Sequence, residues 1–387
     1  MSVLNIERPD FMREEDIRMF EDSVARFFEQ TAPPERVEKW RKDKIVERAM
    51  WEEAAQAGLL GLSTPEEYGG MGGDYRHEVI LMEQIGLKGV DGFGASLHNA
   101  IVMPYIIHYG TEEQKKRWLP RMSSGELISA IAMTEPGAGS DLQGVKTTAK
   151  KSGNGYVING SKTFITNGQM ANLICIVAKT DPTQGAKGIS LVMLETDGAE
   201  GFERGRNLNK LGQPAQDTSE LFFNDVKVPA DNLLGAEEGK GFYQLMSQLP
   251  QERLNIAVQG IATIERALEL TIQYVKGRKA FGKAILDFQN TQFELAECKT
   301  EATVARVFVN HCIGAHLQGK LDAATASMAK YWVSDLEGQI IDRCLQLYGG
   351  YGFMDEFPIR RMYRDSRIQR IYGGANEIMK ILIARTL

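Results

Sequence analysis

The feature that most constrains the fold is a change of hydrophobic pattern at two points along the chain. Residues 1 to about 125 show helical spacing, as in Glu14 to Gln30, where apolar side chains recur every three or four residues. From about 126 to 232 the pattern changes to short alternating runs separated by turn residues, which is typical of β-strands. Helical spacing then returns. The sequence therefore predicts a mainly α protein with a central β domain, divided into residues 1–125, 126–232 and 233–387.

The last part of the chain contains the longest helical segments. Gly241 to Lys276 carries apolar side chains three or four residues apart. Leu286 to Leu317 and Ala323 to Leu347 follow, with only a short polar turn between them. Long helices joined by short turns favour an antiparallel bundle.

The central part offers seven candidate strands. Two of them flank Asn159-Gly160, a dipeptide typical of a tight turn, so we expect strand, turn, strand there. In the second of the two, Phe164 and Thr166 are two residues apart and are expected on one face, where a flat ring with a polar edge would fit. The candidate strands are Ile128 to Met133, Val145 to Ala149, Tyr156 to Asn159, Lys162 to Thr166, Leu173 to Ala178, Ser190 to Glu195 and Ser219 to Val228.

A glycine-rich loop runs from Ile131 to Asp141. Its glycines, Gly137 and Gly139, allow the backbone to approach another group closely, and Ser140 adds a small hydroxyl. Free N–H groups in such a loop can hold a polyanion without a positive side chain. Taken alone, the loop is better explained as a turn of the β domain.

Composition excludes several classes of protein. The net charge of −6 and the pI of about 5.6 argue against a general nucleic-acid binder. No apolar run approaches the length of a membrane span, and the first twenty residues fit neither a secretory nor a transit peptide. The four cysteines are far apart, which predicts no metal site and favours a reducing compartment. No G-x-G-x-x-G fingerprint supports a nicotinamide-binding domain.

Several segments together resemble the acyl-CoA dehydrogenase family. They are Thr134 to Asp141 (Thr-Glu-Pro-Gly-Ala-Gly-Ser-Asp), Ile165 to Gly168 (Ile-Thr-Asn-Gly) and Arg278 to Gly282 (Arg-Lys-Ala-Phe-Gly), and the likeness extends over nearly the whole chain. The resemblance implies an N-terminal helical domain, a small β-barrel or sandwich and a C-terminal four-helix bundle. It also implies an FAD cofactor, an acyl-CoA substrate, an electron-transferring flavoprotein as electron acceptor, and a homotetramer built as a dimer of dimers. The expected location is the bacterial cytoplasm, or the mitochondrial matrix for a processed chain.

The resemblance assigns ligand contacts residue by residue. Many members have tryptophan where Phe164 stands, and the arginine at position 278 meets the FAD pyrophosphate of a neighbouring subunit. The implied substrate contacts are Ser140, Leu249, Arg253, Tyr372 and Gly374. The implied cofactor contacts are Ile131, Met133, Thr134, Gly139, Ser140, Phe164, Ile165, Thr166, Arg278, Phe281, Gln289, Gln346, Gly349, Gly350, Ala375, Asn376 and Glu377.

The catalytic base departs from the commonest family pattern. Most members have Tyr-Glu-Gly where this chain has Tyr372-Gly373-Gly374, and that glutamate is their base. Some members, of the isovaleryl and long-chain types, carry the base beside an arginine on an earlier helix, and Glu252 falls on that position. Without the resemblance, Glu252 would be explained as a first-turn residue favoured by the helix dipole near Pro250. We therefore expect Glu252 to remove the α-proton, with the Gly373 N–H binding the thioester oxygen and hydride passing to flavin N5.

The pattern is nearest to the long-chain type, but three alternatives stay open. A branched-chain or terpenoid acyl-CoA dehydrogenase would share the position of the base. Small residues from Gly92 to Ser96 suggest room for a long or bulky acyl chain. A flavin oxidase of the same fold, such as a nitroalkane oxidase, usually has aspartate as its base. A flavin-binding DNA-associated protein would carry an added basic domain, which this sequence lacks.

Overall fold

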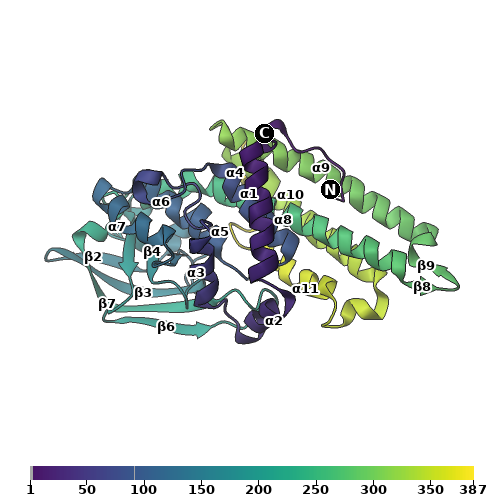
Figure 1. Ribbon diagram of the computed structural model, residues 1–387. Coiled ribbons are helices and arrows are strands. Elements are labelled where there is room, and N and C mark those ends of the chain that lie inside the picture. The colour runs from purple at the N-terminus through teal and green to yellow at the C-terminus, as the bar shows by residue number, and fades with distance from the viewer. Residues whose placement is uncertain (1–2, 91) are drawn as a thin grey trace.

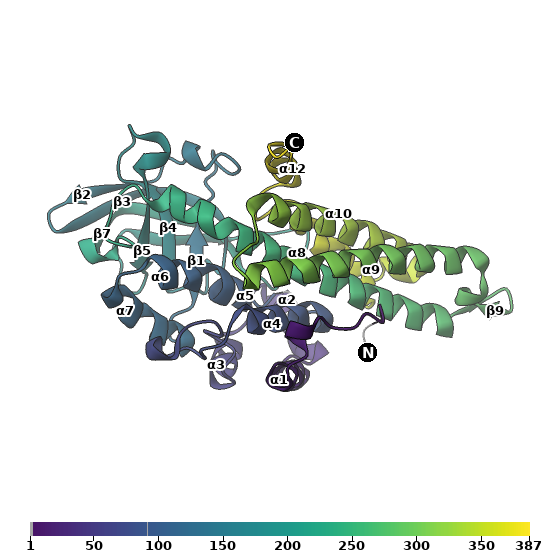
Figure 2. The same cartoon turned by 90° about the horizontal axis from the view of Figure 1, so that it is seen from above.

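The computed structural model describes residues 3–90 and 92–387. The β-sheet and some of the N-terminal helices lie at one end of the molecule, other N-terminal helices lie against its middle, and a bundle of long helices extends to the other end (Figures 1 and 2). The N-terminal part has a π-helical turn, His98–Val102, between α5 and α6. Its helices are α1 (Glu15–Thr31), α2 (Pro34–Asp43), α3 (Arg48–Gln56), α4 (Tyr75–Lys88), α5 (Ala95–Leu97), α6 (Met103–Tyr109) and α7 (Glu112–Ser123).

The β domain is a single seven-stranded sheet. Its order is β1-β4-β2-β3-β7-β6, and β5 pairs with β4. The pairs of β4 with β1 and β2 are parallel, and all the others are antiparallel. The strands are β1 (Ser129–Ala132), β2 (Thr148–Ser152), β3 (Gly155–Thr166), β4 (Leu173–Lys179), β5 (Ile189–Glu195), β6 (Phe202–Asn207) and β7 (Thr218–Pro229). Of these strands, β6 was not predicted from the sequence.

The predicted turn at Asn159-Gly160 is wrong. β3 runs without interruption through both residues and pairs with β7 along its length, with register shifts at Ile158/Gly160 and Lys162/Ile165. Gly160 has a φ of +150° and lies so close to Thr147 that a side chain would collide with it. This glycine therefore serves a bulge in a long strand, because β7 supplies partners on both sides of it.

The C-terminal part is helical, with three long helices as its frame. These are α8 (Gly241–Gly277), α9 (Gln289–Leu317) and α10 (Ala323–Leu347), and the shorter α11 (Pro358–Asp365) and α12 (Asn376–Ala384) follow. The two-stranded β8–β9 hairpin (Lys279–Ala280 and Lys283–Ala284) projects at the end of α8 farthest from the sheet (Figure 2). α4 of the N-terminal part packs on α8, so the bundle combines helices from both helical parts.

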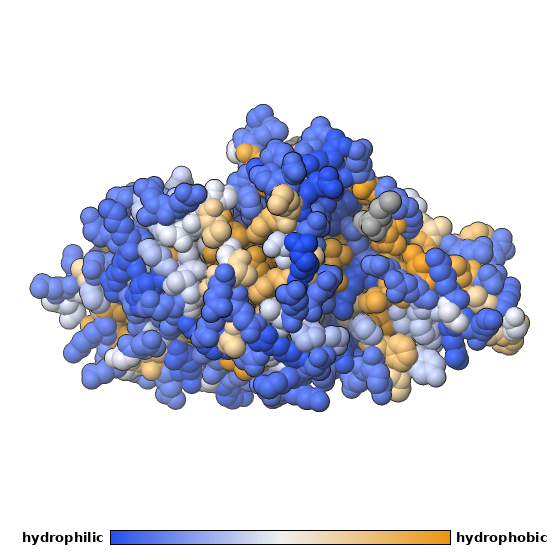
Figure 3. All heavy atoms as spheres, in the orientation of Figure 1, coloured by the Kyte–Doolittle hydropathy of each residue, from blue (hydrophilic) through white to orange (hydrophobic). Residues whose placement is uncertain are grey.

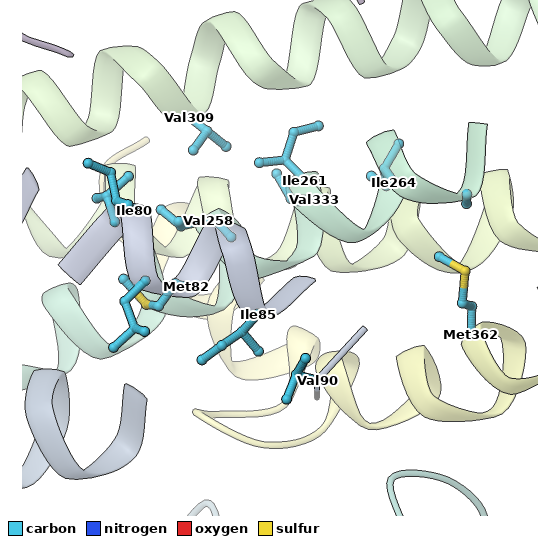
Figure 4. Close-up of a cluster of buried hydrophobic side chains, with 14 of the residues drawn as sticks. Ile80, Met82, Ile85, Val90, Val258, Ile261, Ile264, Val309, Val333 and Met362 are labelled. Atoms are coloured by element: carbon cyan, nitrogen blue, oxygen red, sulfur yellow. The ribbon is translucent and has the colours of Figure 1, made fainter. Parts of the chain in front are cut away.

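Apolar side chains of these helices form one continuous core. Ile80, Met82 and Ile85 of α4 meet Val258, Ile261 and Ile264 of α8, with Val309 and Val333 from α9 and α10 (Figure 4). The apolar face predicted for α8 is confirmed, because all of its residues are buried. Full burial of one such side chain contributes roughly 1.5–3 kcal/mol, so this seam is the main support of the bundle. None of the described helices combines the length and the apolar character needed to span a lipid bilayer.

Candidate active site

Glu252 lies inside α8, on the face that α6 covers. Its side chain is only 6% exposed, and the hydroxyl of Tyr105 in α6 donates a hydrogen bond to Glu252 Oε1 at 2.7 Å. Burial raises the pKa of Glu252 to about 7, while the Tyr105 hydroxyl and the Arg253 guanidinium limit the rise. A carboxyl that titrates near neutral pH is suited to proton abstraction.

The position of Glu252 in its helix argues against a role in helix capping. α8 begins at Gly241, several turns earlier, and Pro250 lies within the helix. The interpretation of Glu252 as a first-turn residue favoured by the helix dipole is therefore wrong. A buried carboxylate in the middle of a helix costs stability, which favours a role in function over one in folding.

Gly373 and Gly374 form a turn with left-handed backbone, at φ values of +63° and +95°. A Cβ placed on Gly373 would lie 2.3 Å from Ile256 Cδ1, so the turn packs against α8 one helical turn from Glu252. Within residues 3–90 and 92–387, the N–H groups of Gly373 and Gly374 have no acceptor. They are available to an outside oxygen, as stabilisation of an oxyanion requires.

A buried lysine of α10 fixes this turn. Lys330 Nζ donates to the Gly374 carbonyl oxygen at 2.7 Å and to Asn376 Oδ1 at 2.8 Å. The side-chain amide of Asn376 in turn donates to Tyr331 O and Ser334 Oγ. Because its polar atoms are engaged within the chain, Asn376 supports the turn, and its direct contact with a cofactor stays a prediction.

The loop after β1 is tied to β3 by a buried ion pair. Lys162 Nζ donates to Glu135 Oε1 and to the Met133 carbonyl oxygen, both at 2.9 Å, and Thr163 N–H donates to the Thr134 carbonyl. Met133, Thr134 and Ile131 are half-buried. The start of the loop is therefore held firmly against β3.

The second half of the same loop is open. Gly139 and Ser140 are exposed, and a Cβ at Gly137 or Gly139 would meet nothing within 4 Å. The backbone there is free to lie against a ligand, as the sequence predicts. Its contact with coenzyme A or FAD stays a prediction.

Phe164 lies at the second bulge of β3, with a φ of +60° and 66% of its surface exposed. Strand alternation does not hold through a bulge, so the argument that placed Phe164 and Thr166 on one face does not apply. Ile165 is buried in the sheet core and Thr166 is half-buried. A left-handed backbone costs a non-glycine residue about 1–2 kcal/mol. An exposed aromatic ring on such a backbone points to a ligand role.

A second group of predicted cofactor residues lies at the far end of the bundle, near the β8–β9 hairpin (Figures 1 and 2). The Arg278 guanidinium lies 5.4 Å from the Tyr351 ring, beside the predicted glycines. In the part of the chain that the structure describes, this guanidinium has no carboxylate partner. The exposed members of the group are Arg278, Phe281, Gln289, Gln346, Gly349 and Gly350. One chain therefore carries the two predicted halves of the FAD site at its opposite ends, and the structure does not bring them together.

The other predicted residues surround Glu252 or the 373–374 turn. Arg253 is buried, its Nη1 donates to Ser327 Oγ at 3.4 Å, and its Nε has no partner among the described residues. The Tyr372 hydroxyl donates to Gln369. Leu249 and Ala375 are half-buried and Glu377 is exposed. Their ligand contacts stay predictions.

Three polar features of the site were not predicted from the sequence: Tyr105, Lys330 and the Lys162–Glu135 pair. Each is a polar side chain in or beside an apolar run, with its partner far away along the chain. A polar residue in such a run is the only signal that could have found them. Over residues 3–90 and 92–387, no group of three or more His, Cys, Asp or Glu side chains could hold a metal ion.

Comparisons with known proteins identify the class to which this fold and site belong. Family models match in chain order: acyl-CoA dehydrogenase, N-terminal domain (residues 14–126), middle domain (130–226) and C-terminal domain (239–387). The chain belongs to the acyl-CoA dehydrogenase family, and the predicted family, fold, FAD cofactor and enzyme class are confirmed.

One curated relative and two solved structures show how similar this chain is to individual members of the family. The mitochondrial long-chain specific acyl-CoA dehydrogenase of Mus musculus is 51% identical over 97% of this chain and 87% of its own length. The crystal structure of an acyl-CoA dehydrogenase from Geobacillus kaustophilus has a TM-score of 0.94 and 49% identity, covering 96% of this chain and 98% of the other. A glutaryl-CoA dehydrogenase from Mycobacterium smegmatis, solved in complex with FADH2, has a TM-score of 0.90 and 28% identity, covering 97% and 95%.

Proposed function

We propose that this protein oxidises a long-chain acyl-CoA to the trans-2-enoyl-CoA, with Glu252 as the base that removes the α-proton. The observation that carries this proposal is the buried Glu252 carboxyl one helical turn from Ile256, which contacts the turn whose Gly373 N–H has no acceptor among the described residues. Loss of a proton next to a thioester carbonyl needs two groups, a base for the proton and a donor for the carbonyl oxygen. We propose that both groups reach the same bound substrate.

In the proposed reaction, the substrate loses a proton and a hydride from neighbouring carbons. Glu252 accepts the α-proton, and the Gly373 N–H stabilises the negative charge that develops on the thioester oxygen. The hydride acceptor at the β-carbon would be supplied by bound FAD. Burial of the site excludes water, which keeps the Glu252 pKa near its working range.

The residues present fit an FAD cofactor held by two subunits. The flavin ring would be held by Met133 and Thr134 after β1 and by Phe164 and Thr166 in β3. The loop after β1 is open in its second half, and the Phe164 ring is exposed. Arg278 would hold the pyrophosphate, which suits an always-charged bidentate donor.

Since these two groups lie at opposite ends of one chain, a second copy must supply the pyrophosphate side. Apolar patches are visible on the face of the molecule in Figure 3, and the C-terminal part exposes large apolar side chains, among them Phe281 and Phe353. We therefore propose a homotetramer built as a dimer of dimers.

The chain length of the substrate rests on the comparison with the mouse relative, whose name specifies long-chain substrates. The small residues near position 92 do not add to this argument. A Cβ on Gly92 would lie 2.4 Å from Ala215, and one on Gly94 would lie 2.1 Å from Asn167. No larger residue fits at these two positions, because the β domain packs against them. A branched-chain or terpenoid substrate is the alternative to be tested.

Electrons must leave the reduced cofactor for an outside acceptor, which we propose to be an electron-transferring flavoprotein. All four cysteines are free and buried, and the described residues hold no metal-binding cluster that could serve as a second redox centre. The location, bacterial cytoplasm or mitochondrial matrix, stays a prediction, because the chain's relatives come from both mitochondria and bacteria.

A single series of acyl-CoA substrates tests the proposal. Straight chains of increasing length, and branched chains, are mixed anaerobically with the FAD-loaded protein, and bleaching of the flavin absorbance is followed. Fastest bleaching with long straight chains supports the proposal, whereas a preference for short branched chains favours the alternative. Turnover with oxygen that equals turnover with the flavoprotein acceptor would favour an oxidase, and salt-dependent DNA binding would favour the DNA-associated class.

A further inference from the structure

The Glu252 carboxyl accepts a hydrogen bond from a different part of the fold. Tyr105 is fully buried in α6, and its hydroxyl lies 2.7 Å from Glu252 Oε1. Across residues 3–90 and 92–387, no other donor to this carboxyl is found. Oε1 therefore accepts the hydrogen bond from Tyr105, and Oε2 remains able to accept a proton.

The fold holds α6 and α8 in fixed register around this contact. The π-helical turn just before α6 presents the Ala100 carbonyl to α8, where Gln251 Nε2 donates to it at 2.9 Å and Asn255 Nδ2 at 3.2 Å. These two donors flank Glu252 in sequence. The hydrogen bond between Tyr105 and Glu252 is therefore clamped by two further bonds across the same helix pair, and π-turns of this kind are frequent at functional sites.

We propose that Tyr105 is a positioning residue for the catalytic base: its hydroxyl holds Oε1 of Glu252 and leaves Oε2 as the atom that receives the substrate proton. The inference rests on the proposed role of Glu252 and deepens it. A hydrogen bond to the ionised form of a carboxyl favours that form, so Tyr105 also keeps more of the base ready at neutral pH.

The other groups that face Glu252 do not replace this role. Cys175 of β4 is buried, and burial together with the charge of Glu252 raises its pKa to about 12, so it remains a neutral thiol. Arg253 follows Glu252 in α8, but its one hydrogen bond within the described residues goes to Ser327 of α10. Burial, with the charge of Glu252, raises the pKa of Tyr105 well above 10, so its hydroxyl stays a donor throughout the working range.

The test uses the FAD-loaded protein and the pH profile of single-turnover flavin bleaching by palmitoyl-CoA, from about pH 6 to about pH 9. Tyr105→Phe removes only the hydroxyl. We expect the midpoint of the profile to move up by roughly one pH unit, from the size of a hydrogen bond to a charged group. The rate near pH 7 then falls about fivefold and recovers toward the wild-type plateau at high pH. Replacing Tyr105 by 3-fluorotyrosine strengthens the donor, so the midpoint should move down.

A matched control is Tyr156→Phe, because Tyr156 of β3 is also a buried tyrosine and also donates to a carboxyl, Glu238 Oε1, at 2.7 Å. Its pH midpoint should not move. As a second readout, infrared difference spectroscopy of the FAD-free protein follows the Glu252 carboxyl, identified by its loss in Glu252→Gln. Its titration midpoint should move as the kinetic midpoint does.

Two results separate the proposals. If Tyr105→Phe and the fluorotyrosine variant leave both midpoints unchanged, Tyr105 has only a structural role and the inference fails, whatever the rate. If Glu252→Gln retains normal flavin bleaching, the base lies elsewhere and the proposed function of Glu252 fails, independently of Tyr105.

Discussion

Moving the base from α8 to the 373–374 turn tests whether the two positions share one substrate atom. Glu252→Gln keeps the shape of the side chain and removes its basicity, so flavin bleaching should slow at least about a hundredfold, the scale expected for a lost general base. Gly373→Glu in that background supplies a carboxylate at the position where the family resemblance expects one. We expect partial recovery of the bleaching rate.

The structure indicates how far the recovered bleaching rate should stay below the wild-type rate. Gly373 has a φ of +63°, and a left-handed backbone costs a residue with a side chain about 1–2 kcal/mol. If that cost falls on the transition state, the recovered rate stays about 5- to 30-fold below the wild-type rate. The Cβ would also lie 2.3 Å from Ile256 Cδ1, so Ile256 has to move.

Ile256→Val removes Cδ1, the atom that would overlap with the new Cβ. It therefore separates the steric effect of Ile256 from the cost of the left-handed backbone at position 373. Added to the double variant, it should raise the bleaching rate further, while the same change in the wild-type chain serves as the control for its own cost of about 0.5–1.5 kcal/mol. Stopped-flow absorbance under anaerobic conditions measures all the variants. A triple variant no faster than the double variant would show that Ile256 is not the obstacle, and near-normal bleaching by Glu252→Gln alone would refute the whole scheme.

Three further outcomes are expected. Arg278→Ala should lose FAD on gel filtration while the fraction that keeps FAD is reduced at the normal rate; full retention of flavin absorbance would contradict a pyrophosphate role. Lys330→Met should lower both the melting temperature and the bleaching rate, because the Gly374 carbonyl loses its donor and Asn376 Oδ1 keeps only Ser334 Oγ, at a cost of about 1–3 kcal/mol; unchanged values would show that the turn does not depend on Lys330. The wild-type bleaching rate should rise with pH through about pH 7, because burial sets the pKa of Glu252 there and the carboxylate is the reactive form; a flat profile measured in stopped flow would exclude this group as the base.

The sequence was most informative where one local pattern decides the structure. Thr111 and Gln114 exchange hydrogen bonds at the start of α7, as the Thr-x-x-Gln pattern of a capping box requires. The apolar face of α8 is confirmed because a period of three to four residues, sustained over a long segment, is typical of an amphipathic helix and of no strand.

The sequence predictions failed where residues far away along the chain determine the local structure. Asn159-Gly160 carries a strong hairpin signal, but β7 pairs with both sides of it and turns the glycine into a bulge. The position of Tyr105 opposite Glu252 depends on a π-helical turn and on two clamping side chains, and no spacing within the Tyr105 segment reveals it. The glycines near position 92 suggested space for an acyl chain, whereas contact with the β domain explains them.

The exchange of the base between two positions has a physical basis in this packing. The donor that we propose for the thioester oxygen is the N–H of residue 373, which belongs to the backbone and is present whatever the side chain. The carboxylate can therefore come from α8 while the turn carries a glycine. Because Ile256 occupies the space of the missing Cβ, a glutamate at 373 fits only if Ile256 moves, and the proposed base on α8 accepts a hydrogen bond from Tyr105. Glu252, Ile256, Tyr105 and Gly373 form one coupled set, so a change at any one of them should alter the effect of the others.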